Sequence, residues 1–189
     1  MPRAGLNAAI VVERAARMLD QNPSDTLNLA AVAQSFGVRA PSLYKHIDGM
    51  SGLQRAVMLE ARRGLTTAVG QAAIGRSRDD AIRSMAFAYR RWALEHPGQY
   101  SMTLHASLPD DDEDREVAES FMHVIFTVLA GYDLRDTDAI DATRFVRSAL
   151  HGFVALEAAG GFGLPFDLER SYARLVDSVV TALETWSRG

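Results

Sequence analysis

Residues 29–47 of the chain read LAAVAQSFGVRAPSLYKHI. The first half carries apolar side chains at helical spacing, namely Leu29, Val32, Ala33 and Phe36. Gly37 is suited to end this short helix, because glycine adopts the left-handed conformation without steric cost. Pro41 is suited to the first turn of a further helix, where its missing N–H is not needed. The stretch therefore predicts two short helices joined by a tight turn.

Two short helices and a glycine turn, preceded by another helix, form a helix-turn-helix. We expect Ala33 to let the helices approach closely, Val38 to fill the space between them and Leu43 to pack inward. The exposed side of the second helix then carries Arg39, Ala40, Ser42, Tyr44, Lys45 and His46. Several of these side chains are donors that contact phosphates and major-groove base edges. The pattern therefore favours DNA binding over a three-helix core motif without a DNA role.

The rest of the chain also indicates helices, since alternating strand patterns and Asn-Gly or Asp-Gly hairpin turns are absent. Later helices are expected over residues 78–95, 99–107, 115–131, 137–159 and 167–187. The acidic run 110–114 is expected to form a solvated loop leading into a helix. The predicted class is all-α with about nine helices. Residues 1–50 form the helix-turn-helix domain and residues 51–189 a second domain, with the fourth helix, from about residue 51, as the joint.

Composition and charge narrow the function further. The chain has 189 residues, a net charge of −4 and no cysteine, which excludes disulfides, thiolate metal sites and cysteine nucleophiles. No apolar run reaches the roughly 20 residues that span a bilayer, and the start of the chain lacks an apolar signal core, so cytoplasm is expected. Residues 1–65 carry +3 and the remainder −7. A basic segment joined to an acidic one is compatible with a nucleic-acid-binding module.

Residues 8–58 resemble the N-terminal DNA-binding domain of the TetR family of transcriptional repressors. The resemblance rests on a capping threonine, an apolar-Ala pair, the Gly-Val turn, the recognition-helix motif and a later leucine: Thr26, Val32-Ala33, Gly37-Val38, Leu43-Tyr44-Lys45-His46 and Leu53. Ile47 stands where the family usually has Phe, and Met50 stands where it usually has Lys. The lysine change removes one phosphate contact, so affinity would depend more on Lys45, Tyr44 and Arg39.

The resemblance implies that the second helix of the motif enters the major groove. Arg39, Ser42 and Ala40 are then the candidates for reading bases. Tyr44, Lys45 and Thr26 would contact the DNA backbone, and His46 would either do the same or pack on the fourth helix.

Residues 148–163 resemble a TetR C-terminal domain subfamily that is marked by a Trp-His-Gly motif and a later Gly-Gly-Phe turn. Leu150 replaces the Trp, whereas His151, Gly152 and the turn 160–162 match. Glycine inside a helix costs about 1 kcal/mol relative to alanine, so we expect a close helix crossing at Gly152.

The resemblance also implies a homodimer on a palindromic double-stranded operator, built from the last two long helices. The candidate interface residues, which could instead be intrachain core, are Leu150, Val154, Tyr172, Val176, Val179, Val180 and Leu183. A pocket for an unknown small-molecule effector would lie among the middle helices. Its candidate lining, for which plain core packing is the alternative, is Tyr89, Trp92, Tyr100, Met102, His105, Phe121, Met122, Ile125, Phe145 and His151.

The resulting interpretation is a repressor that a ligand releases from its operator, with no cofactor and no membrane partner. A ligand-insensitive or activating regulator of the same fold is the alternative. An enzyme would have to use Glu157 near His151, or the acidic run 110–114. The chain offers no phosphate-binding loop, no His-x-x-x-His pair and no nucleophile–base spacing to support that hypothesis.

Overall fold

The computed structural model describes residues 6–23, 26–104 and 110–186. Every regular element in these ranges is a helix, which confirms the predicted all-α class. Within the same ranges, no single helix is long and apolar enough to cross a membrane. Residues 112–132 and the helix α7 (Asp136–Ala158) are long and apolar enough only when they are taken together. The two segments are bent relative to each other by 109°.

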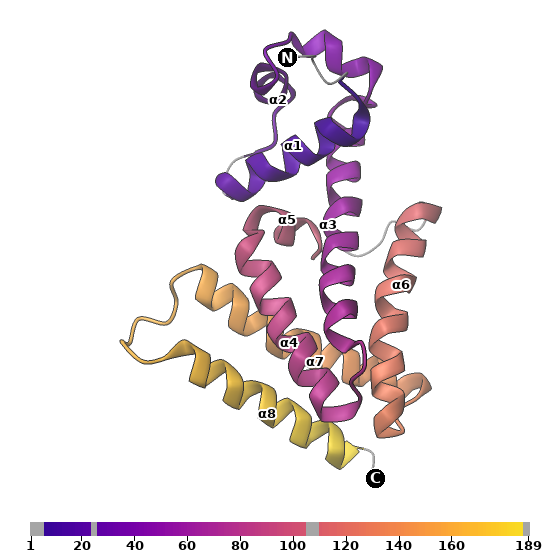
Figure 1. Ribbon diagram of the computed structural model, residues 1–189, viewed down its shortest axis with the longest axis vertical. Helices are drawn as coiled ribbons and strands as arrows, with labels where there is room; N and C mark the ends of the chain where they lie inside the picture. Colours follow the sequence, from indigo (N-terminus) through magenta and orange to yellow (C-terminus); the bar gives the residue numbers. More distant parts are fainter. Residues whose placement is uncertain (1–5, 24–25, 105–109, 187–189) are drawn as a thin grey trace. The chain divides into compact units, whose positions relative to one another are not determined.

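Packing divides the chain into two compact units, which we call the N-terminal unit and the C-terminal unit. The N-terminal unit comprises residues 1–64 and 95–108, and the C-terminal unit comprises residues 65–94 and 109–189. The first division falls inside the long helix α3 (Gly49–Ala73), the helix in which the sequence places the joint (Figure 1). Residues 95–108 return to the N-terminal unit, although they follow the helix α4 (Arg78–Glu95) in the chain.

The N-terminal unit contains the helix-turn-helix, made of α2 (Leu29–Ser35) and the 3₁₀ helix η1 (Ala40–Lys45). Gly37 has φ +67° and ends α2. The Gly37 N–H donates to the Gln34 carbonyl at 2.9 Å and the Val38 N–H donates to the Ala33 carbonyl at 3.1 Å, which is a Schellman motif. The predicted glycine turn is therefore confirmed. Val38 is 36% exposed, so it does not fill the space between the helices.

The start of α2 differs from the family pattern quoted above. The Asn28 side chain accepts a hydrogen bond from the Ala30 N–H at 2.8 Å, so Asn28 is the N-cap. Thr26 lies two residues earlier and is exposed, which corrects its expected capping role. Below the motif, α1 (Ala8–Gln21), α2, η1 and the start of α3 share one apolar core.

A short helix, α5 (Pro97–Met102), packs on the C-terminal part of α1. Asp20 accepts hydrogen bonds from the Gln99 N–H at 3.0 Å and from Gln99 Nε2 at 2.6 Å, and its carboxylate lies 3.0 Å from His96 Nδ1. Gly98 is buried in this contact, where an added Cβ would lie 2.2 Å from the Leu19 carbonyl oxygen. The missing side chain therefore sets the distance between the two helices. The helix expected over 99–107 ends at Met102.

The C-terminal unit contains α4, α6 (Asp112–Leu129), the one-turn 3₁₀ helix η2 (Ala130–Tyr132), α7 and α8 (Leu168–Trp186). The Asp111 side chain accepts from the Asp114 N–H at 3.0 Å and so caps α6. The acidic run thus leads from a turn at Asp110 into the first turn of α6, which agrees with the expected loop leading into a helix. Asp112, Glu113 and Asp114 lie at the positive end of the helix dipole, which favours carboxylates.

Arg90 joins three helices of this unit and is only 7% exposed. Its guanidinium donates two hydrogen bonds to Glu157 on α7, both 2.6 Å, and one of 2.6 Å to Glu169 on α8. The guanidinium carbon also lies 4.9 Å from the centre of the Tyr172 ring. The hydrogen bonding to Glu157 raises the pKa of Arg90 above its ordinary value. The charge is therefore buried with its partners in place.

Candidate DNA-binding face, ligand pocket and dimer surface

The geometry of η1 separates side chains that face the core from those that face outward. A 3₁₀ helix has three residues per turn, so residues three apart line up. The three rows are Ala40–Leu43–His46, Pro41–Tyr44 and Ser42–Lys45. Leu43 is fully buried and Ala40 packs against the same apolar core. The first row therefore faces inward and the other two face outward.

The candidate DNA contacts separate along these rows. Arg39, Lys45 and Tyr44 are exposed, with Tyr44 at 59%, and Ser42 is half-buried. Ala40 and His46 are half-buried on the inward row, which favours packing for both. Arg39 is the N-cap residue of η1 and has an extended backbone. Its exposed side chain therefore lies next to the outward rows, at the start of the helix. Contact of these side chains with DNA stays a prediction.

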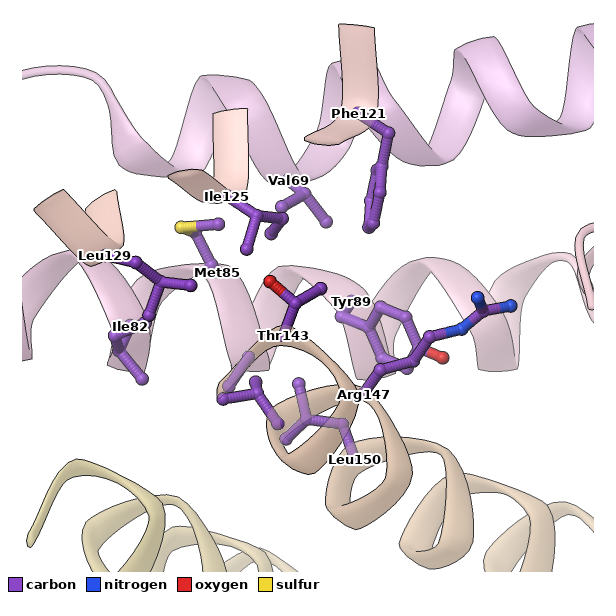
Figure 2. A pocket seen from close by; sticks show the side chains of 12 residues that line it. Val69, Ile82, Met85, Tyr89, Phe121, Ile125, Leu129, Thr143, Arg147 and Leu150 are labelled. Atoms are coloured by element: carbon purple, nitrogen blue, oxygen red, sulfur yellow. The ribbon is translucent and has the colours of Figure 1, made fainter. Parts of the chain in front are cut away.

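A cavity in the C-terminal unit is lined from four helices, α3, α4, α6 and α7 (Figure 2). The lining consists of Val69, Ile82, Met85, Ala86, Tyr89, Phe121, Ile125, Leu129, Thr143, Val146, Arg147 and Leu150. The volume of the cavity that the centre of a water molecule can occupy is about 40 Å³. This is roughly three times the volume that a single water needs by the same measure. The cavity is therefore narrow, and most of the side chains that line it are apolar.

Three of the ten candidate ligand residues line this cavity, namely Tyr89, Phe121 and Ile125. Tyr100 and Met102 belong to α5 in the N-terminal unit, and Met102 packs against its core. His105 lies outside the described residues. The remaining candidates are in the C-terminal unit without lining this cavity: Trp92, Met122, Phe145 and His151. These six described residues therefore do not line this cavity, and their contact with a ligand stays a prediction.

Helical spacing could have identified most of the missed lining. On α7, Thr143, Val146, Arg147 and Leu150 follow each other at intervals of three, one and three residues, the pattern of a single helix face. The candidate residues were chosen mainly because they are aromatic or methionine. That criterion selects large side chains whether or not they face the cavity. Packing instead selected the branched aliphatic side chains that neighbouring helices share.

The seven candidate dimer residues lie inside the protomer. Leu150 is 6% exposed and lines the cavity, and Val154, Tyr172, Val176, Val179, Val180 and Leu183 are at most 3% exposed. The Tyr172 hydroxyl donates to the Ala86 carbonyl at 2.7 Å, and burial raises the pKa of that hydroxyl. These side chains form the intrachain core, because an apolar stripe is equally suited to either role. The choice of residues is corrected.

Another face of the same two helices carries mostly small side chains. On α8 a shallow groove is lined by Arg174, Asp177, Ser178, Thr181, Ala182 and Thr185. On α7, Ser148, Gly152, Ala155 and Ala159 recur at intervals of four, three and four residues, all exposed or half-buried. An added Cβ at Gly152 would meet nothing within 4 Å, so the expected close crossing is absent within the protomer.

Two of the residues that an enzyme would use have structural roles here. Glu157 is held by Arg90, and Asp111 caps α6. Among the described ranges, no group of three His, Cys, Asp or Glu side chains could hold a metal ion.

A family model described as "Tetracyclin repressor-like, C-terminal domain" matches residues 82–179. The chain is 38% identical over 158 residues to the HTH-type transcriptional regulator Rv0681 of Mycobacterium tuberculosis, covering 83% of this chain and 72% of the relative. It is 35% identical over 188 residues to the HTH-type transcriptional regulator YobS of Bacillus subtilis, covering 96% and 95%.

Solved structures share the fold. The regulatory protein SCO4313 superposes with a TM-score of 0.73 at 25% identity, over 91% of this chain and 94% of that chain. A single-residue variant of TetR from Acinetobacter baumannii AYE in complex with minocycline also has a TM-score of 0.73, at 15% identity, over 96% and 98%. Together with the family model and the two relatives, the helix-turn-helix and the helical C-terminal unit show that the chain belongs to the TetR family of transcriptional regulators, and not to an enzyme family.

Proposed function

We propose that this chain is a repressor that binds a palindromic DNA operator as a homodimer and is released by a small-molecule ligand. The observation that carries the DNA-binding part is the outward surface of η1, where Arg39, Tyr44 and Lys45 are exposed while Leu43 is fully buried. The buried row anchors the helix, so the exposed donors are held in fixed positions for a major groove.

The dimer is proposed to use the small-residue faces of α7 and α8. Interaxial distances depend on the side chains at the crossing, so small residues let helices pack closely. The stripe on α7 has open space at Gly152, and the groove on α8 is shallow and exposed. On α8, Asp177 pairs with Arg83 of α4 inside the protomer at 3.0 Å, whereas Ser178, Thr181 and Thr185 are exposed. We infer that these exposed positions and the stripe on α7 pack on the same helices of a second copy in a twofold arrangement.

The narrow cavity supports release by a ligand. The cavity has room for about three water molecules, so we infer that a larger molecule parts the helices that form the walls when it binds. The wall helix α4 is followed in the chain directly by α5, which packs on α1. A ligand that binds the parted conformer more tightly shifts the equilibrium toward it, and by linkage weakens operator binding by the same free energy. We infer that the two helix-turn-helix motifs of the dimer then no longer match successive major grooves.

Selection from a randomised double-stranded DNA library tests the proposal. The full-length protein is expected to enrich an inverted repeat, because two copies of one motif read the same half-site in opposite directions. Enrichment of no sequence at all would contradict the proposal.

Replacing Lys45 with alanine is expected to weaken binding to all DNA sequences alike. Lys45 is exposed on the Ser42–Lys45 row and contacts a phosphate in this proposal. The logarithm of the binding constant falls as the logarithm of the salt concentration rises, and losing one phosphate contact makes this negative slope shallower by about one. Mobility-shift titrations at several salt concentrations measure the slope.

Two further variants make that result specific. Arg170→Ala removes an exposed arginine of α8 and is expected to leave the slope unchanged. Arg39→Ala is expected to change which base is preferred, since an arginine bound to a base edge contributes about 1–3 kcal/mol of discrimination. An unchanged preference would remove Arg39 from base reading.

Replacing Thr181 with arginine is expected to convert the dimer to a monomer. Thr181 lies in the exposed groove of α8, where a long charged side chain would hold two closely packed helices apart. Sedimentation equilibrium should then give the mass of one 20.7 kDa chain instead of two. Ser120→Arg on the exposed side of α6 is the matched control and should remain dimeric. A dimeric T181R protein would place the interface elsewhere.

A further inference from the structure

Two of the polar side chains that line the cavity of the C-terminal unit, Tyr89 and Arg147, lie at one end of it. Figure 2 shows Tyr89 and Arg147 at one end and Ile82 and Leu129 at the other. The Thr143 hydroxyl donates within its own helix, to the Ala139 carbonyl at 2.7 Å. Most of the wall is hydrocarbon, so an apolar molecule would gain by leaving water for it.

Arg147 is an exposed cation without a counter-charge in the described part of the chain. Its neighbours one turn away on α7 are Thr143, Arg144, Leu150 and His151, none of which is acidic. Arg144, three residues earlier, pairs with Asp141 at 3.3 Å, whereas Arg147 makes no hydrogen bond or ion pair with any described residue. The other cation central to this unit, Arg90, is held by two carboxylates.

We propose that the cavity takes a small apolar molecule with a single anionic group, such as a carboxylate, whose charge binds Arg147 while its apolar part enters between α4, α6 and α7. The inference rests on the ligand-binding function proposed above and adds the chemical class of the ligand. A guanidinium presents paired N–H donors that match the two oxygens of a carboxylate. The Tyr89 side chain lies at the same end of the cavity as Arg147.

Three probes with the same eight-carbon chain separate charge from hydrophobicity. Octanoate, octan-1-ol and octylammonium are titrated into the full-length protein by isothermal titration calorimetry. Octanoate is expected to bind at least about tenfold more tightly than octan-1-ol, the scale of a charge-assisted hydrogen bond. Octylammonium is expected to bind most weakly, since its charge has the sign of Arg147. Equal binding of octanoate and octan-1-ol, or a preference for octylammonium, would overturn the inference.

Variants of the chain locate the effect. Arg147→Gln is expected to weaken octanoate about tenfold and to leave octan-1-ol unchanged, whereas Arg144→Gln, on the same helix and already paired with Asp141, should change neither. Ile125→Trp, at a half-buried wall position, should abolish binding of both probes by filling the cavity. Circular dichroism of each variant checks that it is folded.

The outcomes also separate this inference from the function on which it rests. If R147Q binds octanoate as the unchanged protein does, or if I125W still binds it, the proposed site is wrong. If none of the three probes binds the unchanged protein, the ligand class is wrong. Operator selection with the same preparation shows independently whether the chain is a sequence-specific DNA-binding protein.

Discussion

Replacing Arg90 with methionine is expected to lower the free energy of unfolding by about 3 kcal/mol, because removing one member of a buried ion pair leaves its partner uncompensated. The side chain of Glu157 is only 14% exposed, and it receives two of the three hydrogen bonds that Arg90 donates to carboxylates. Glu169 is 66% exposed and can be solvated by water, so it contributes little to the loss. Urea denaturation followed by circular dichroism measures the change.

The double variant R90M/E157M is the control for this prediction. Replacing a buried ion pair with apolar side chains of similar size is often neutral or stabilising. We therefore expect the double variant to recover most of the stability that the single variant loses. A single variant as stable as the unchanged protein would show that the three helices α4, α7 and α8 do not depend on this charge.

Replacing Gly98 with alanine is expected to cost about 3 kcal/mol, the upper part of the usual range for overpacking. The new Cβ would lie 2.2 Å from the Leu19 carbonyl oxygen and 2.3 Å from its carbonyl carbon. These are backbone atoms, so α5 would have to move away from α1. That movement would also lengthen the hydrogen bonds between Asp20 and Gln99. Urea denaturation again measures the loss.

A second glycine gives a matched comparison. At Gly70, inside α3, an added Cβ would lie 3.6 Å from Val124 Cγ2, which is an ordinary contact. Gly70→Ala is therefore expected to be neutral or to stabilise by up to about 1 kcal/mol, since alanine favours a helix over glycine. Equal losses for G70A and G98A would mean that the close approach of α5 to α1 does not contribute to stability.

Local sequence signals predicted most helices well. The helix expected over 78–95 has those bounds, and α7 and α8 differ from their expected ranges by a single residue at each end. The Gly37 turn was also predictable, because its Schellman hydrogen bonds join residues that are close neighbours in the chain. Where two local signals competed, as for Thr26 and Asn28 at the start of α2, the sequence did not show which side chain forms the cap.

The candidate sites were harder to predict than the helices. The exposed donors of η1 followed from the spacing of Leu43 and Gly37, but the inward position of Ala40 depends on the three-residue turn of a 3₁₀ helix. The apolar stripe of α8 was correctly seen as buried, yet it packs inside the protomer and not against a partner. A stripe of valines has the same chemistry in both cases.

The amino-acid sequence was sufficient for the helical class, the helix-turn-helix and the outward donors, because these depend on hydrophobic period, turn residues and charge within short stretches. Other features join residues that are far apart in the chain. In the Arg90 ion cluster and in the contact of Gly98 with Leu19, the partners are 67 to 79 positions apart. The cavity wall likewise combines residues from distant helices. Such contacts depend on how helices cross, which a local pattern does not specify. That is why the surroundings of Arg147 and Gly98 could be described only from the packed structure.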